Sequence, residues 1–233
     1  MIDIPFHLVL SVLFLVFAAM YIGVGIFSEL EESLRKRWTF SFVAGSAALL
    51  ALQGLLVGFG FKESDHQHTG YLVAFFLPPT LFFAWFLFSK QLFSENQLSL
   101  KHLTLVQIFR APLNLIILWL ISKSIAPDEL IGPLRYFGLF IGISSVIVWQ
   151  LWKSESNIGR SLMFVWNIAG LVSLGSWFFH TITLLPGEGE LIEANWIPYQ
   201  FPLLWLPGFL SPLLLFSHFY SLKYLMHKNI SEG

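Results

Sequence analysis

Three polar residues stand at helical spacing inside an otherwise apolar stretch of the chain. They are Gln107, Arg110 and Asn114, within residues 103–122. Positions i, i+3 and i+7 share one face of a helix, so these side chains are expected to lie together. An arginine near the centre of a membrane span costs roughly 3 kcal/mol on insertion scales. We therefore predict that this face turns away from lipid, towards partner groups, water or a ligand.

Polar residues of two other spans are expected at the same depth as Arg110. Counted from the predicted cytoplasmic boundaries, Arg110, Asn167 and His218 all lie roughly 9–11 Å inside the membrane. Ser221 shares a helix face with His218. A guanidinium among hydrogen-bonding groups suits a carboxylate, a phosphate or a lipid headgroup. The predicted ligand-binding residues are Gln107, Arg110, Asn114, Asn167, His218 and Ser221.

Two alternatives to a ligand pocket remain open. His218 could titrate in a water-filled path for protons or ions. Arg110 could instead only hydrogen-bond free carbonyls and hold helices together, with Asn167 and His218 as its partners. A cavity beside Arg110 would favour the ligand pocket, whereas a guanidinium saturated by carbonyl groups would favour the structural role.

Histidines also gather towards the opposite membrane face. His66, His68 and His180 lie on the predicted outer side, and imidazole groups can ligate a divalent metal. Their spacing matches no metal-binding template, so we predict no metal site there, and nothing in the sequence identifies a cofactor. A polar stripe on the sixth span is predicted to serve helix packing. It consists of Ser173, Ser176, His180 and Thr183.

The elements that position these residues follow from the composition. Of the 233 residues, 56% are hydrophobic and 12% are charged, about half the charged share of a soluble domain. Charges cluster between long apolar runs, which is typical of a polytopic helical membrane protein. A net charge of -1 without a basic tract argues against nucleic acid as a partner. No nucleophile motif, zinc motif or phosphate loop is present, so an enzyme is not favoured.

Seven stretches are long enough to cross about 30 Å of hydrocarbon. We predict an all-α bundle of seven transmembrane helices that forms a single polytopic domain over residues 1–233. The Pro78-Pro79 pair interrupts the third stretch, which is the weakest of the seven. The predicted spans cover residues 5–28, 38–61, 71–89, 103–122, 134–152, 161–185 and 202–226.

The distribution of Lys and Arg predicts the orientation. Nine of these residues fall on one side of the spans, three fall on the other, and Arg110 lies within a span. The positive-inside rule then places the N-terminus outside and the C-terminus in the cytoplasm. The nine are Arg35, Lys36, Arg37, Lys90, Lys101, Lys153, Arg160, Lys223 and Lys228; the three are Lys62, Lys123 and Arg135.

Two local patterns bear on how the spans begin and pack. Two glycine pairs, Gly54 with Gly58 and Gly138 with Gly142, stand four residues apart, a spacing that permits close approach of two helices. The charged segment 29–37 is predicted to be a solvated turn. The alternative is a short surface helix, because Glu32 and Lys36 are spaced for an i, i+4 ion pair.

Several motifs in the C-terminal half resemble a known group of proteins. They are Arg110-Ala111-Pro112, Trp166-Asn167, Pro202, Trp205-Leu206-Pro207, Pro212, His218 and Ser221-Leu222. This pattern is similar to that of an uncharacterised family of bacterial seven-span integral membrane proteins. The resemblance implies a location in the bacterial inner membrane and a shared Arg–Asn–His level, but it implies no chemistry.

These observations lead to one favoured function and one alternative. The favoured function is binding or transport of a small anion or a lipid-like ligand in a pocket at Arg110. The alternative is a non-catalytic accessory subunit of a membrane complex. The expected partners are membrane lipids, a small anion or lipid headgroup, and a membrane protein or a second copy of the chain.

Overall fold

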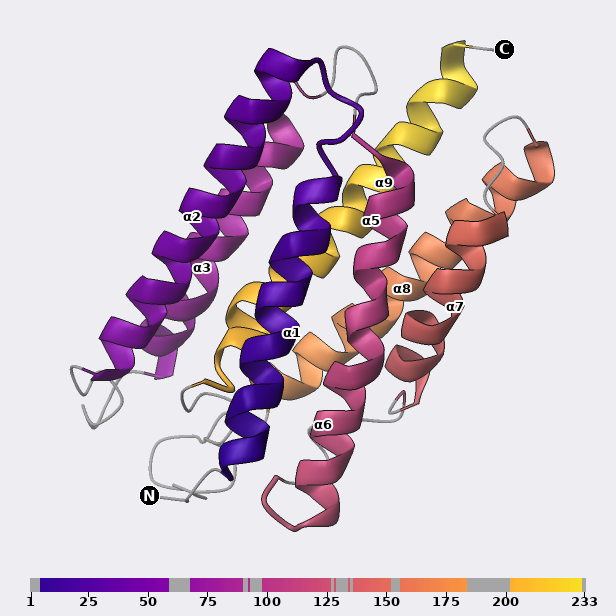
Figure 1. Cartoon of the computed structure of the whole chain (residues 1–233). Coiled ribbons are helices and arrows are strands. Elements are labelled where there is room, and N and C mark those ends of the chain that lie inside the picture. The colour runs from indigo at the N-terminus through magenta and orange to yellow at the C-terminus, as the bar shows by residue number, and fades with distance from the viewer. Residues whose placement is uncertain are drawn as a thin grey trace.

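The computed structural model describes residues 5–58, 68–89, 92, 98–126, 128, 134, 136–151, 156–183 and 202–231. These residues form seven helical rods and no strand, which confirms the all-α prediction for the described part of the chain. In Figure 1 the rods form a tilted bundle, in which α1 begins at one end and α9 finishes at the other. The bounds are α1 Phe6–Gly25, α2 Glu32–Gly58, α3 His68–Phe88, α5 Leu100–Val106, η1 Gln107–Phe109, α6 Arg110–Ser122, α7 Phe137–Leu151, α8 Asn157–Thr183, η4 Leu206–Leu210 and α9 Ser211–Ser231.

Among the described helices, four are long and apolar enough to cross a membrane. They are Phe6–Gly25, Glu32–Val57, Leu100–Ser122 and Ile158–His180. Large apolar side chains on their outer faces are exposed, among them Phe14 and Phe40, as expected for contact with lipid. These features indicate a membrane protein. Each of the seven predicted spans overlaps one rod, and membrane crossing by α3, α7 and α9 stays a prediction.

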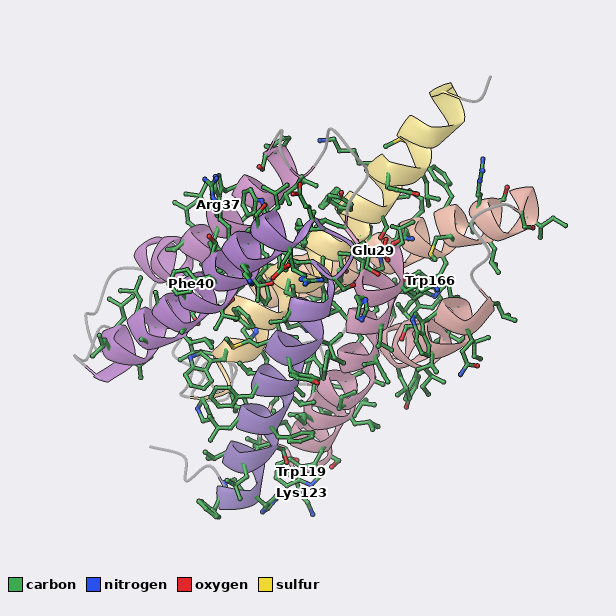
Figure 2. The ribbon with its side chains drawn as sticks, turned by 45° about the horizontal axis from the view of Figure 1, so that its top comes forward. Glu29, Arg37, Phe40, Trp119, Lys123 and Trp166 are labelled. Atoms are coloured by element: carbon green, nitrogen blue, oxygen red, sulfur yellow. The ribbon has the colours of Figure 1, made fainter. Side chains whose placement is uncertain are left out.

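The start of α2 corrects one sequence prediction. The helix begins at Glu32, so residues 32–37 form its first turns and not a solvated turn. The Lys36 ammonium lies 2.6 Å from the Glu32 carboxylate, with both side chains largely exposed. This i, i+4 pair stabilises the helix where it enters solvent. Arg37 near this end and Lys123 after α6 lie at opposite ends of the bundle (Figure 2).

Two rods depart from α-helical geometry, and prolines account for part of this. In the fourth rod, η1 is a 3-10 segment between α5 and α6, and in the last rod η4 is a π-helix. Pro212 lacks an N–H group, so the carbonyl of Gly208 four residues earlier loses its helical donor. The side-chain amide of Gln53 on α2 donates to that carbonyl over 3.1 Å. A residue of α2 thus satisfies a backbone group that the proline leaves free.

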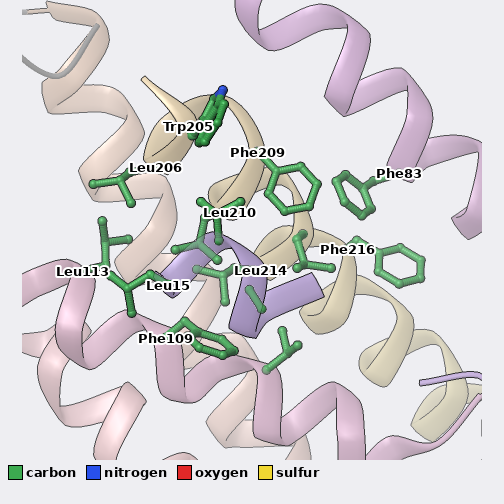
Figure 3. Packing of buried hydrophobic residues seen from close by; sticks show 14 of the residues in the cluster. Leu15, Phe83, Phe109, Leu113, Trp205, Leu206, Phe209, Leu210, Leu214 and Phe216 are labelled. Atoms are coloured by element: carbon green, nitrogen blue, oxygen red, sulfur yellow. The ribbon is translucent and has the colours of Figure 1, made fainter. Parts of the chain in front are cut away.

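Aromatic residues fill the space between α2, α3 and the last rod. The ring of Phe83 lies 5.9 Å from that of Phe209 and 5.9 Å from that of Phe216 (Figure 3). Phe86 packs against Phe216 from the same helix face, with ring centroids 6.2 Å apart. Pro78 and Pro79 lie inside α3, which continues through them. We call Phe27, Phe42, Phe83, Phe86, Phe209 and Phe216 the aromatic cluster.

Helices α6 and α7 approach closely at the predicted glycine pair. A Cβ atom added to Gly142 would overlap the backbone nitrogen and Cβ of Ala111. A Cβ atom on Gly138 would lie 3.1 Å from the amide nitrogen of Asn114. The predicted close approach at Gly138 and Gly142 is therefore confirmed, and it brings α7 against the polar face of α6.

Candidate functional site

The guanidinium of Arg110 lies buried between α6, α8 and α9. Arg110 is the first residue of α6, directly after the 3-10 turn, and it is only 4% exposed. One of its terminal nitrogens donates to the carbonyl of Gly170 over 3.0 Å, and the other donates to the hydroxyl of Ser173 over 2.7 Å. Both partners belong to α8. The side chain therefore turns away from lipid, as its cost at this depth requires.

A chain of hydrogen bonds continues from Arg110 through His218. The guanidinium lies 3.4 Å from Nε2 of His218, and Nδ1 of His218 lies 2.8 Å from Oδ1 of Asn167. The Asn167 amide nitrogen donates to the carbonyl of Met163 over 2.7 Å, which fixes its oxygen towards His218. His218 thus donates from Nδ1 and accepts at Nε2, so a neutral imidazole satisfies every partner. We call Arg110, His218 and Asn167 the relay.

Neutral groups alone surround the Arg110 charge in the described part of the chain. Its hydrogen-bond partners are the carbonyl of Gly170, the hydroxyl of Ser173 and the imidazole of His218, and the described residues that line the cavity beside it include no carboxylate. The hydrogen bonds of Arg110 to Gly170, Ser173 and His218 use at most three of its five N–H donors. A buried charge is normally paired with an opposite charge, because otherwise desolvation is not offset. The site therefore has capacity for an anion.

A cavity of about 40 Å³ lies against Arg110, between α6, α7 and α8. Its polar wall is formed by Arg110, Asn114 and Ser173. It extends along α6 towards Ile117, the direction of the predicted outer side of the membrane. Its apolar wall consists of Leu113, Ile117, Leu134, Leu174 and Trp177, and Gly138 completes the lining. A volume of this size has room for about three water molecules or a small polar group.

Asn114 has unused hydrogen-bonding capacity at this cavity. The residue is 9% exposed, and its side-chain oxygen has no hydrogen-bond partner among the described residues. It stands one turn after Arg110, so both side chains share the face that lines the cavity. A buried polar atom without a partner carries a desolvation cost.

The structure divides the six predicted ligand-binding residues into three groups. Arg110 and Asn114 line the cavity, whereas Asn167 and His218 are relay residues that lie outside its lining. Gln107 and Ser221 form the third group, which neither lines the cavity nor belongs to the relay. Gln107 donates to the carbonyl of Leu214 over 2.9 Å and to the hydroxyl of Ser217, and Ser221 donates to the carbonyl of Ser217 over 2.8 Å. Gln107 thus joins the fourth rod to α9, whereas the bond of Ser221 stays within α9.

Two residues of the site were not predicted. Ser173 was assigned to a packing stripe, but it accepts a hydrogen bond from Arg110 and lines the cavity. Gly170 supplies a carbonyl to Arg110, and a Cβ atom there would overlap the ring of His218. A signal was present in the sequence, because Asn167, Gly170 and Ser173 recur every three residues on one helix face.

The outer histidines are only partly described. His66 and the side chain of His68 lie outside the described residues, and His180 is half-buried near the end of α8. Among the residues that the structure describes, no group of three or more His, Cys, Asp and Glu residues could hold a metal ion. The prediction about metal binding at His66, His68 and His180 is therefore not tested.

Comparison of the chain with protein-family models, with curated proteins and with solved structures gave no match. The functional argument therefore rests on the geometry of the site.

Proposed function

We propose that this chain is a membrane protein that binds or transports a small anion or an anionic lipid headgroup at Arg110. The observation that carries the proposal is a buried guanidinium that lines a cavity and has no carboxylate partner among the described residues. An anion in the cavity would offset the cost of desolvating the charge. It would also accept hydrogen bonds from the guanidinium N–H groups that the relay does not use.

The proposal includes the membrane arrangement. It places seven spans in a bacterial inner membrane, with the N-terminus outside and the C-terminus in the cytoplasm, as the Lys and Arg distribution indicates. With this orientation, the cavity beside Arg110 extends towards the outer side. Access from outside is therefore expected, with the relay closing the cytoplasmic side of the cavity.

The competing account makes Arg110 a purely structural residue, which would suit an accessory subunit. In its favour, Arg110 already bonds to Gly170, Ser173 and His218. It leaves unexplained why a cavity and the unpartnered Asn114 oxygen stand beside the guanidinium. The two accounts differ in whether an added anion changes the stability of the protein.

The test measures thermal unfolding of the purified protein at constant ionic strength. Chloride, acetate and phosphate are added in turn, and phosphatidylcholine nanodiscs are compared with nanodiscs that also contain phosphatidylglycerol. We expect at least one of these probes to stabilise the wild type, by about 2.7 kcal/mol at a concentration 100 times its Kd. Arg110→Gln should lose that response. The proposal fails if no probe stabilises the wild type, or if Arg110→Gln responds equally.

A matched pair of variants keeps the test decisive if Arg110→Gln does not fold. Leu174 lines the cavity and Leu50 does not, and both are almost fully buried. Leu174→Phe should fill the cavity and remove the response to the probe, whereas Leu50→Phe should retain it. Equal responses from the two variants would contradict a site in this cavity.

A further inference from the structure

The guanidinium of Arg110 keeps N–H groups on two neighbouring nitrogens for a ligand. Its bonds to Gly170 and His218 both come from Nη1, and its bond to Ser173 comes from Nη2. The Nε–H group takes no part in these bonds, and Nη2 carries a second N–H group. A guanidinium commonly binds a planar carboxylate through two parallel hydrogen bonds from neighbouring nitrogens. The remaining donors therefore suit a carboxylate better than a spherical ion such as chloride.

The side chain of Asn114 offers a further donor beside the guanidinium. Its oxygen is buried, so the amide nitrogen is the group of this side chain that a molecule in the cavity can meet. A Cβ atom at Gly138 would lie 3.1 Å from this nitrogen, and Gly138 lines the cavity. The missing side chain at Gly138 thus leaves the nitrogen uncovered on the side of α7. An amide N–H group donates to a carboxylate oxygen, so Asn114 favours the same kind of ligand as Arg110.

A single positive charge faces the cavity, and this limits the charge of the ligand. Of the described residues that line the cavity, Arg110 alone carries a formal charge. A dicarboxylate or a doubly charged phosphate would bring a second negative charge that these residues do not neutralise, at a high desolvation cost. The balance of charge therefore favours a monovalent anion.

The apolar part of the cavity wall favours a ligand with a short hydrocarbon part. Leucine, isoleucine and tryptophan side chains form this wall, in a cavity of about 40 Å³. Each methylene group that a ligand buries against such a wall raises its affinity about 4-fold. A volume of this size holds about three water molecules, so it takes only a short chain beside the carboxylate. An inorganic ion would leave the apolar wall without a contact.

We propose that the ligand is a short-chain monocarboxylate, whose carboxylate accepts hydrogen bonds from Arg110 and from the amide nitrogen of Asn114. The hydroxyl of Ser173, which accepts from Arg110, still has a proton to donate to the same carboxylate. The hydrocarbon part of the ligand faces the leucine and isoleucine side chains of α6 and α8. This inference rests on the proposed function, since it names the class of anion that the Arg110 cavity takes.

The experiment compares carboxylates that differ in one property at a time. Binding of acetate, propionate, hexanoate and malonate is measured by calorimetry on the protein in phosphatidylcholine nanodiscs, at neutral pH and constant ionic strength. We expect propionate to bind about 4-fold more tightly than acetate, because it buries one more methylene group. Malonate carries a second carboxylate and should bind more than about 100-fold more weakly than propionate. Hexanoate should bind no more tightly than propionate, because its chain exceeds the cavity.

Two pairs of variants assign the binding to the amide of Asn114. Asn114→Leu removes the donor and should weaken propionate binding about 10-fold, whereas Gln53→Leu makes the same kind of change on α2 and should keep the wild-type affinity. Gly138→Ala adds a methyl group beside the amide nitrogen and should also weaken binding, which keeps the test decisive if Asn114→Leu does not fold. Gly175→Ala is its control, because a Cβ atom there would meet nothing within 4 Å.

The outcomes separate this inference from the proposed function. If chloride, phosphate or phosphatidylglycerol binds in an Arg110-dependent way and no carboxylate does, the ligand class is wrong and the proposed function stands. Malonate binding as tight as that of propionate would overturn the single charge, and an affinity that keeps rising to hexanoate would overturn the short chain. Unchanged propionate binding in Asn114→Leu, or in Gly138→Ala, would overturn the amide contact. If none of the probes binds, both the inference and the proposed function fail.

Discussion

The last rod of the bundle is packed by different means on its two sides. Towards α8 and α6, His218 joins Asn167 and Arg110 through directed hydrogen bonds. Towards α2 and α3, Phe209 and Phe216 join the aromatic cluster, which relies on ring packing. Hydrogen bonds fix the register of two helices because each donor needs its own acceptor, whereas rings tolerate small shifts. The relay side is therefore the one able to hold a guanidinium in a defined position beside a cavity.

The largest effect is expected on the relay side. His218→Ala removes the acceptor for Arg110 and the donor for Asn167, each worth about 1–3 kcal/mol when left unpaired. We expect the free energy of unfolding to fall by about 3 kcal/mol, measured by unfolding in detergent mixed with dodecyl sulfate. Phe219→Ala is the control, because the neighbouring Phe219 is exposed. A loss below about 1 kcal/mol would show that the relay is not held by these bonds.

A smaller effect is expected in the aromatic cluster. Phe86→Ala leaves a void among Phe27, Phe42 and Phe216. Lipid tails are as apolar as this core, so the cost comes mainly from lost packing, about 2 kcal/mol. The response to a stabilising anion should not change, unlike that of Leu174→Phe. Exposed Leu81 on the same helix provides the control variant Leu81→Ala. A lost anion response in Phe86→Ala would remove the distinction between the two sides.

The smallest effect is expected at the hydrogen bond between Gln53 and Gly208, on the side of the last rod that faces α2 and α3. Gln53→Leu withdraws the donor from the carbonyl of Gly208, which Pro212 leaves without a helical partner. We expect a loss of about 1 kcal/mol in the free energy of unfolding, with the same assay. The neighbouring variant Leu52→Ala, at an exposed position, provides the comparison. An increase in stability would show that Gly208 does not need this donor.

Much of the fold could be predicted because it depends on local patterns. Seven apolar stretches correspond to seven helical rods, and the glycine pair at Gly138 and Gly142 marks a real close approach. The start of α2 was misplaced because the charged residues 32–37 were predicted to lie outside the helix. They form its first turns, which extend beyond the apolar segment into solvent. The 3-10 segment η1 and the π-helix η4 were not located, because apolar periodicity predicts a helical rod without showing where one of its turns tightens or widens.

The sequence alone determined that the chain is helical and rich in membrane-like segments, and that Arg110 must turn away from lipid. Both follow from composition and helical periodicity, which are local properties. Only the tertiary structure decided which side of the guanidinium meets the relay and which side meets a cavity. It also directed Gln107 to α9, left Ser221 bonded within α9, and brought Ser173 and Gly170 to the guanidinium. The physical reason is that the rotation of each helix about its axis is set by close contacts with its neighbours, and depth along the chain does not reveal it.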